Sequence, residues 1–183
     1  MKKYFLYFML GLLLSSFSSN TLQQEPKKIY KIAKANGDTL LCYDYKLKFY
    51  GTNYIKYIEF TNKSNNEKIK IKPPEGFVII YPSGSTVLFD TTGYDSGNIE
   101  ISGKDYILTR RVFDNGLPHY FIINKNYGRV RELTRTKKCV DELKKYFGDC
   151  PEFIEEIDLV AKEFDRAKFP FAKFDALIQR YKC

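Results

Sequence analysis

Lysines alternate with apolar residues in two short segments, and this pattern is suited to binding chemistry. Side chains two residues apart on a β-strand point to the same face, so each set presents a row of ammonium groups. Such rows can hold a polyanion, and tyrosine rings beside them offer stacking surfaces for rings of a ligand. The candidate ligand face consists of Lys46, Lys48, Lys68, Lys70, Lys72, Tyr43 and Tyr45, with Tyr50, Tyr54 and Tyr57 close in sequence.

Two interpretations of this face stay open. One is a site for an anionic ligand, such as a glycan, a lipid headgroup or a nucleic acid. The other is an exposed sheet edge, where lysines prevent pairing with further strands. No nucleic-acid-binding motif frames the lysines, so we do not expect specific nucleic-acid binding.

Catalytic and metal-binding chemistry has little support. The only histidine, His119, follows a turn and leads into an apolar run, which favours a solvated or packing role. No phosphate-binding loop, nucleophile elbow, zinc-protease motif or dinucleotide fingerprint is present. We therefore expect no cofactor and no enzymatic activity; an enzyme whose site is assembled from scattered polar residues is the weaker alternative.

Four cysteines, Cys42, Cys139, Cys150 and Cys183, allow three pairings. Cys150 and Cys183 bracket two predicted helices that would return the chain end toward Cys150, so we predict that these two pair. Cys42 and Cys139 would then form a second pair, or remain as two buried thiols. A zinc site is disfavoured, since there is no C-x-x-C motif.

The first residues predict export. Lys2 and Lys3 precede an apolar run of about ten residues that ends in small polar residues, the plan of a secretory signal peptide. The run is shorter than the roughly 20 residues needed to span a bilayer, and no later stretch is longer, so no transmembrane helix is expected in the mature chain. We predict a signal peptide over 1–18 and a flexible leader over 19–28.

The remaining chain suits one basic domain. It belongs to a 183-residue sequence with a formal net charge of +8 at pH 7. Without the two lysines of the signal peptide the charge would be about +6, which is compatible with anionic partners or simply with solubility. Aromatic residues make up 16% of the chain, which favours strands over disorder.

The pattern predicts an α+β fold with an antiparallel β-rich region over 29–135, built as a sandwich, curled sheet or partial barrel of about nine strands. An Asn36-Gly37 hairpin joins 29–35 to a second strand over Thr39–Phe49. In that strand Tyr43 and Tyr45 share a face, and Cys42 lies on the other. The continuous apolar run Phe77–Tyr81 predicts a strand covered on both faces, and 90–98 reads as a surface loop.

The period changes to that of helices in the tail, 136–183, which we expect to pack on the β-region. A helix over Thr136–Phe147 ends at Gly148, and Pro151 suits the first position of the next one. Pro170 opens a last helix. All three carry apolar stripes that need a partner surface.

Over most of its mature length, the chain resembles a group of exported proteins of unknown activity that is abundant in Bacteroidetes. The resemblance rests on Asn36–Leu40, Tyr120–Ile122, Asp149–Pro151 and Tyr181–Cys183. Members often have Tyr-Asn-x-Cys near the end, where this chain is one residue shorter, and a glycine where Cys42 stands. The resemblance implies an extracytoplasmic location and a Cys150–Cys183 bridge, but no activity. We expect an exported structural or interaction protein in the periplasm, at the envelope or secreted, whose partner is an envelope protein or an anionic ligand.

Overall fold

The computed structural model describes residues 27–133, 136, 138–162 and 171–180. The predicted signal peptide, the leader up to residue 26, and Cys183 lie outside these residues. The described elements are β1 Tyr30–Lys34, β2 Thr39–Cys42, β3 Tyr45–Tyr50, β4 Tyr54–Thr61, β5 Lys68–Ile71, β6 Phe77–Ile80, β7 Thr86–Phe89, β8 Asp95–Ser102, β9 Tyr106–Val112, β10 Pro118–Asn124, β11 Arg129–Glu132, α2 Lys138–Tyr146, α3 Pro151–Lys162 and α4 Phe171–Arg180.

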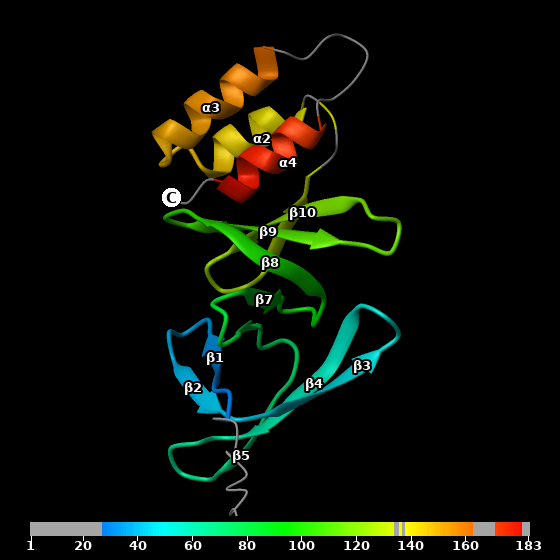
Figure 1. Cartoon of the computed structure of the whole chain (residues 1–183), viewed down its shortest axis with the longest axis vertical. Helices are drawn as coiled ribbons and strands as arrows, with labels where there is room; N and C mark the ends of the chain where they lie inside the picture. The colour runs from blue at the N-terminus through cyan, green and yellow to red at the C-terminus, as the bar shows by residue number, and fades with distance from the viewer. Residues whose placement is uncertain (1–26, 134–135, 137, 163–170, 181–183) are drawn as a thin grey trace, which may run out of the picture.

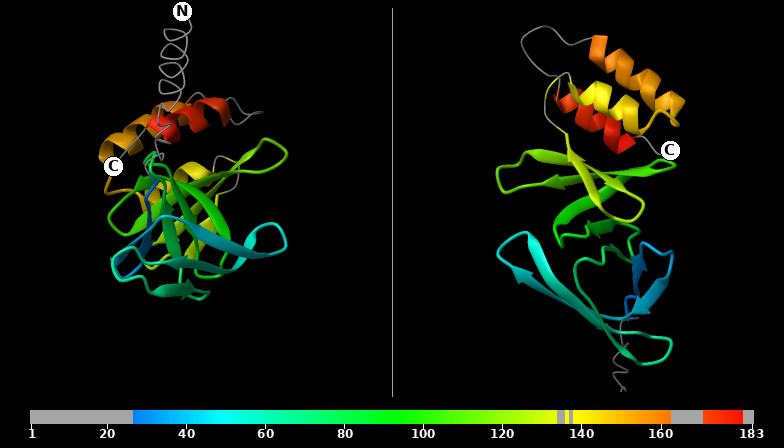
Figure 2. Two further views of the ribbon diagram at one scale, coloured as in Figure 1. Left: turned by 60° about the horizontal axis from the view of Figure 1, so that its bottom comes forward. Right: turned by 180° about the vertical axis from the view of Figure 1, so that it is seen from behind.

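The strands form two antiparallel sheets, and the three helices follow, so the predicted α+β class is confirmed. The larger sheet has eight strands in the order β11-β10-β9-β8-β7-β6-β1-β2, and the smaller has three in the order β3-β4-β5. Figures 1 and 2 show the helices at one end of the molecule and the three-stranded sheet at the other. The eleven described strands exceed the nine or so predicted, in part because the run Thr39–Phe49 is divided between β2 and β3.

Three apolar clusters hold these layers together. The first lies between the three-stranded sheet and β1, β2, β6 and β7, and includes Ile32, Ile58 and Phe77. The second joins Val78 of β6 to Ile123 of β10, which are four strands apart in the sheet order, so the larger sheet curls without closing. The third lies under the helices. Phe77 and Val78 belong to different clusters, which confirms that β6 is covered on both faces.

The predicted strand over Thr39–Phe49 is wrong, because the chain changes sheets within it. β2 ends at Cys42 in the larger sheet, and β3 begins at Tyr45 in the smaller one. The intervening Tyr43 and Asp44 reset the alternation of side chains. Cys42 therefore lies fully buried in the first cluster instead of on a polar face.

The predicted surface loop over 90–98 is also wrong. Asp90 and Ser96 are both fully buried, and β8 begins at Asp95. The segment looks polar because its side chains form a buried hydrogen-bond network, and buried polar groups are tolerated when they are paired.

The helices follow the apolar stripes closely. α2 ends at Tyr146, just before Gly148, and Pro151 is the first residue of α3. Leu143, Phe153 and Ile178, one from each helix, are buried together with Ile101 and Leu108 of the sheet. The expected packing of the tail on the β-region is therefore observed for the described residues.

The second cysteine pair is contradicted. Cys42 and Cys139 are free thiols, buried in different clusters at opposite ends of the molecule. Their separation follows from the topology, since Cys42 faces the three-stranded sheet and Cys139 lies on α2. Cys150 is buried among the helices, and its pairing with Cys183 stays a prediction because Cys183 lies outside the described residues.

Candidate functional site

The predicted lysines share the outer face of the three-stranded sheet. The register pairs Lys46 with Glu59 and Glu59 with Lys70, so these side chains point the same way. Lys48 pairs with Tyr57 on the same face, and Lys68 pairs with Thr61. The inner face of this sheet carries Ile58, Phe60 and Ile71. The alternation of lysines and isoleucines in β5 therefore separates a basic surface from the core.

Part of this face is hollowed into a groove of about 710 Å³. Lys70 and Lys72 come from β5 and its exit, and Pro73 closes that side. Thr92 contributes from the segment before β8. The remaining polar lining is aromatic and basic and comes from the β3–β4 hairpin: Tyr50, Tyr54, Lys56 and Tyr57. Three ammonium groups and three phenol rings thus converge on one space.

The charges in the groove are only partly compensated. Lys70 Nζ lies 3.3 Å from a carboxylate oxygen of Glu59 and 3.9 Å from the centre of the Tyr57 ring. Lys56 Nζ lies 5.2 Å from the centre of the Tyr50 ring. Within the described part of the chain, no carboxylate oxygen lies within 4.0 Å of the ammonium groups of Lys56 or Lys72. The groove therefore has a positive potential suited to an anion.

A second, smaller cavity of about 180 Å³ lies farther along the same face. Lys46 and Lys68 line it together with Asp44 and Glu59. Two carboxylates and two lysines line this cavity, so its lining carries no formal net charge, although the ion pair of Glu59 is with Lys70 of the groove. Lys48 lies on the face beside Tyr57 without lining either cavity.

Two of the predicted site residues, Tyr43 and Tyr45, do not belong to the groove. Tyr45 points inward, where its hydroxyl donates a hydrogen bond of 3.0 Å to the Tyr81 hydroxyl and its ring meets Tyr30 edge-on. Burial, followed by that hydrogen bond, raises the pKa of Tyr45. Tyr43 is exposed at the change of sheets, where the Lys27 and Lys63 ammonium groups lie 5.5 and 5.3 Å from its ring. The change of sheets at residues 43–44 interrupts the alternation of side chains, which explains the positions of both tyrosines.

Lys56 is a groove residue that alternation conceals. Tyr57 pairs with Lys48 and Ile55 pairs with Phe49, so Lys56 is the extra residue of a β-bulge in β4. Without the bulge, neighbouring residues Lys56 and Tyr57 would point to opposite faces. With it, both line the groove. The signal in the sequence was an Ile55–Ile58 spacing of three within a strand whose core residues otherwise alternate.

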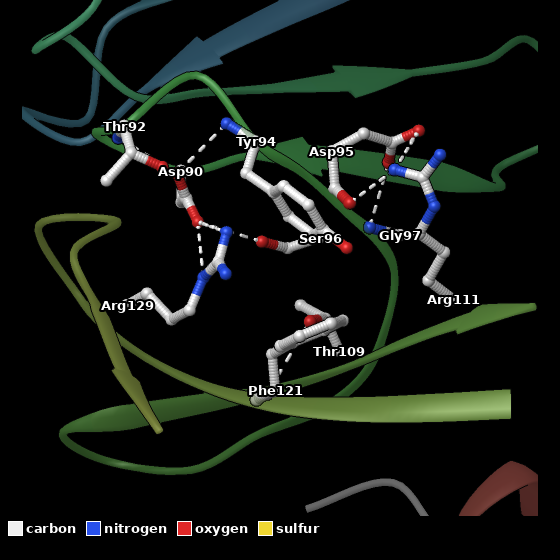
Figure 3. A network of polar contacts seen from close by, with 10 residues as sticks. All are labelled: Asp90, Thr92, Tyr94, Asp95, Ser96, Gly97, Thr109, Arg111, Phe121 and Arg129. Carbon is white, nitrogen blue, oxygen red and sulfur yellow. Dashed lines mark hydrogen bonds and ion pairs between the residues drawn. The ribbon is translucent and has the colours of Figure 1, made fainter. Parts of the chain in front are cut away.

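A buried carboxylate supports one wall of the groove (Figure 3). Asp90 accepts hydrogen bonds from the Thr92 backbone and hydroxyl at 2.9 and 2.6 Å and from the Tyr94 backbone at 3.1 Å. Arg129 pairs with its other oxygen, with Nε at 2.8 Å, and the Ser96 hydroxyl donates to that oxygen at 3.3 Å. The Arg129 guanidinium also lies 4.0 Å from the centre of the Tyr94 ring. This network holds Thr92 in the groove wall.

A second arginine connects the two sheets near the same place. Arg111 Nη1 donates to the backbone oxygen of Asp95 at 2.6 Å, and Nη2 donates to the Asn53 side chain at 2.8 Å. Burial raises the pKa of the Asp95 carboxyl, although Arg111 opposes the shift. Tyr54 and Tyr94 pair as an isolated bridge, with their rings 5.1 Å apart. The β3–β4 hairpin is thus anchored to β8 and β9.

A third polar cluster docks α4 on the sheet. Arg110 donates to both oxygens of Asp175, at 2.7 and 3.0 Å, and the Tyr120 hydroxyl donates to the same carboxylate. Burial opposes the charged form of Asp175, but the hydrogen bonds from Arg110 and Tyr120 outweigh it, so its pKa is lowered. This arrangement is far from the groove and ties helix to sheet.

Among the described residues, the thiols of Cys42 and Cys139 are buried and the side chain of His119 is paired. Burial raises the pKa of the Cys42 thiol to about 11 and that of Cys139 to about 12, which keeps both protonated and unreactive. His119 Nδ1 lies 2.6 Å from the Glu132 carboxylate, and its ring packs edge-on against Phe113. No group of three potential metal ligands occurs among the described residues.

Comparison with known proteins gives no match to a family model, a curated protein or a solved structure. Among the described helices, none is long and apolar enough to cross a membrane.

Proposed function

We propose that this protein is a non-enzymatic interaction module that binds an anionic ligand in the groove on its three-stranded sheet. The observation that carries the proposal is the groove itself, where Lys56, Lys70 and Lys72 converge with three tyrosine rings in a space of about 710 Å³. Ammonium groups supply attraction to negative charge, and the exposed rings supply flat surfaces for the uncharged parts of a ligand.

The lysines do not act only as guards of a sheet edge. Edge protection requires charges on β3 and β5, which are the outer strands of this sheet. Lys56 lies on the central strand β4, where it protects no edge, and a bulge turns it toward the groove. A binding function explains why the groove gathers a lysine from the central strand.

The site is proposed to work outside the cytoplasm. This part of the proposal rests on the amino-terminal segment with Lys2, Lys3 and a short apolar run, and on the resemblance to exported proteins. Outside the cytoplasm, anionic glycans and lipid headgroups are the anionic ligands that such a protein would encounter. Buried, protonated thiols and a histidine paired with Glu132 support a binding role over a catalytic one.

The test is a titration with fluorescent dextran sulfate, with uncharged dextran as the control polymer. A triple variant, Lys56→Gln, Lys70→Gln and Lys72→Gln, removes the three groove charges. A matched variant, Lys31→Gln, Lys104→Gln and Lys138→Gln, removes three exposed lysines elsewhere. We expect the groove variant to bind at least roughly tenfold more weakly and to lose part of the salt dependence, since each contact to a polyanion releases counterions.

The matched variant should bind dextran sulfate nearly as well as the parent, because its lysines do not line the groove. Equal weakening in the two variants would show that net charge alone drives association, and the proposed site would be wrong. Labelled single-stranded DNA provides a further arm: submicromolar binding that depends on the groove lysines would make nucleic acid the ligand.

A further inference from the structure

We infer that the tips of the β3–β4 and β9–β10 hairpins form a docking edge for an anionic lipid bilayer. This inference rests on the proposed function, because the groove beside the first tip would hold the lipid headgroups. It adds apolar side chains that enter the membrane interface, and it identifies the anionic ligand as the headgroup of a membrane lipid.

The exposed apolar residues of the molecule gather at these two tips. Among the described residues, eight large hydrophobic side chains are exposed, and five of them lie here. The β3–β4 tip carries Phe49, Tyr50 and Tyr54, with Tyr50 63% exposed, and the β9–β10 tip carries Val112 and Leu117 at 49% and 43%. Single exposed apolar residues are ordinary, but a cluster at the ends of two adjoining hairpins marks an interaction surface.

The two tips are held side by side. They project from the same side of the molecule in every view of Figures 1 and 2. Arg111, at the end of β9, reaches the β3–β4 turn through its 2.8 Å hydrogen bond to Asn53. The same guanidinium lies 5.2 Å from the centre of the Phe113 ring, at the start of the other turn. One side chain therefore fixes the spacing of the two hairpins.

A bilayer fits this edge better than a protein partner does. Protein interfaces need a continuous, well-packed patch, whereas these apolar groups stand at the ends of two separate hairpins. Projecting apolar groups can enter lipid without a complementary surface. Tyrosine rings are enriched at the membrane–water boundary because one end of the ring is apolar and the other is hydrated.

The lysines near the β3–β4 tip favour a bilayer with an anionic surface. Lys48 and Lys56 flank the β3–β4 tip, and Lys70 and Lys72 lie in the adjoining groove. A lysine close to an anionic leaflet strengthens binding by roughly fivefold. Apolar tips with flanking lysines provide the two signals, insertion and electrostatics, that together give stable peripheral attachment.

The test is sedimentation with vesicles of phosphatidylcholine alone and of phosphatidylcholine mixed with phosphatidylglycerol. The tip variant is Val112→Thr with Leu117→Ser, which leaves the groove untouched. Its matched control is Val130→Thr with Leu159→Ser, two positions of similar exposure (41% and 54%) away from the tips. Dextran sulfate binding is measured for every variant.

We expect the parent to bind the anionic vesicles and not the neutral ones. The tip variant should lose roughly tenfold in vesicle binding, through lost apolar burial, and keep its dextran sulfate binding. The control should keep both. Failure of the parent to bind vesicles while it binds dextran sulfate would overturn the membrane inference alone. The membrane inference would also be wrong if the tip variant bound anionic vesicles as well as the parent does, or if the parent bound neutral and anionic vesicles equally well. If the parent bound neither vesicles nor dextran sulfate, the proposed function would be wrong as well.

Discussion

Replacement of Asp90 by alanine should strongly destabilise the fold, because it leaves Arg129 without its buried partner. The Asp90 side chain is fully buried, while that of Arg129 retains 24% exposure. Breaking a buried ion pair by removing one partner costs about 3–5 kcal/mol. Water can reach part of the Arg129 guanidinium, so we expect the lower end, about 3 kcal/mol. For a domain of this size that corresponds to a fall of about 6–12 °C in Tm.

Urea unfolding followed by far-ultraviolet circular dichroism measures this loss. Asp105→Ala is the control, since Asp105 is an exposed carboxylate between β8 and β9, and its removal should change stability by less than about 0.5 kcal/mol. Asp90→Asn should fall between the two, because an amide still accepts hydrogen bonds from the Thr92 backbone. Equal stabilities for Asp90→Ala and the control would refute the structural role of this network.

Three further predictions concern the rest of the molecule. Asp175→Asn should destabilise the fold by about 2 kcal/mol at neutral pH, because hydrogen bonds to a charged carboxylate are lost. Folding lowers the pKa of Asp175, so this contribution to stability is present above the ordinary carboxyl pKa and disappears as the pH falls through the folded pKa. The stabilities of parent and variant should therefore converge in acid, and a difference that stays constant with pH would contradict the prediction. Gly97→Ala should lower the unfolding temperature far more than Gly116→Ala. Both glycines have positive φ, but of the two only Gly97 is so placed that an added Cβ would collide with a backbone oxygen, that of Arg110. Equal effects of the two substitutions would contradict this placement. Non-reducing peptide mapping should find Cys150 linked to Cys183, with Cys42 and Cys139 alkylated only after unfolding, whereas a Cys139–Cys150 link would refute the pairing.

Local periodicity predicted the elements whose environment is set by near neighbours. β5 alternates lysine with isoleucine, and one face of it is buried, as a period of two requires. Pro151 and Gly148 mark the boundary between α2 and α3, because proline fits a first helical turn and glycine ends one. These features depend on a few adjacent residues, so the sequence alone was sufficient for them.

Features set by distant residues could not be predicted in this way. The segment around Asp90 has the composition of a surface loop, and its burial becomes favourable only because Arg129 arrives from β11. Lys56 points into the groove because β4 contains a bulge relative to β3. The change of sheets at Tyr43 and Asp44 depends on two separate pairings, β1 with β2 and β3 with β4.

The candidate site shows the same division. The row Lys68, Lys70 and Lys72 was visible as an alternation and does lie on one exposed face. The aromatic partners were misassigned in part, since Tyr45 points into the core and Tyr43 lies at the change of sheets. Sequence spacing identified the basic strand, but only the pairing of three strands shows which tyrosines share its groove.

Chemical-shift mapping with a short sulfated oligosaccharide tests the proposed site most directly. The amide resonances of isotopically labelled protein are followed during the titration. Binding in the groove predicts the largest shifts at Lys56, Tyr57, Lys70 and Thr92, all of which line or adjoin it, with saturation at one ligand per chain. Shifts spread evenly over exposed lysines such as Lys31, Lys104 and Lys138, or concentrated on α2–α4, would contradict the assignment of function to this groove.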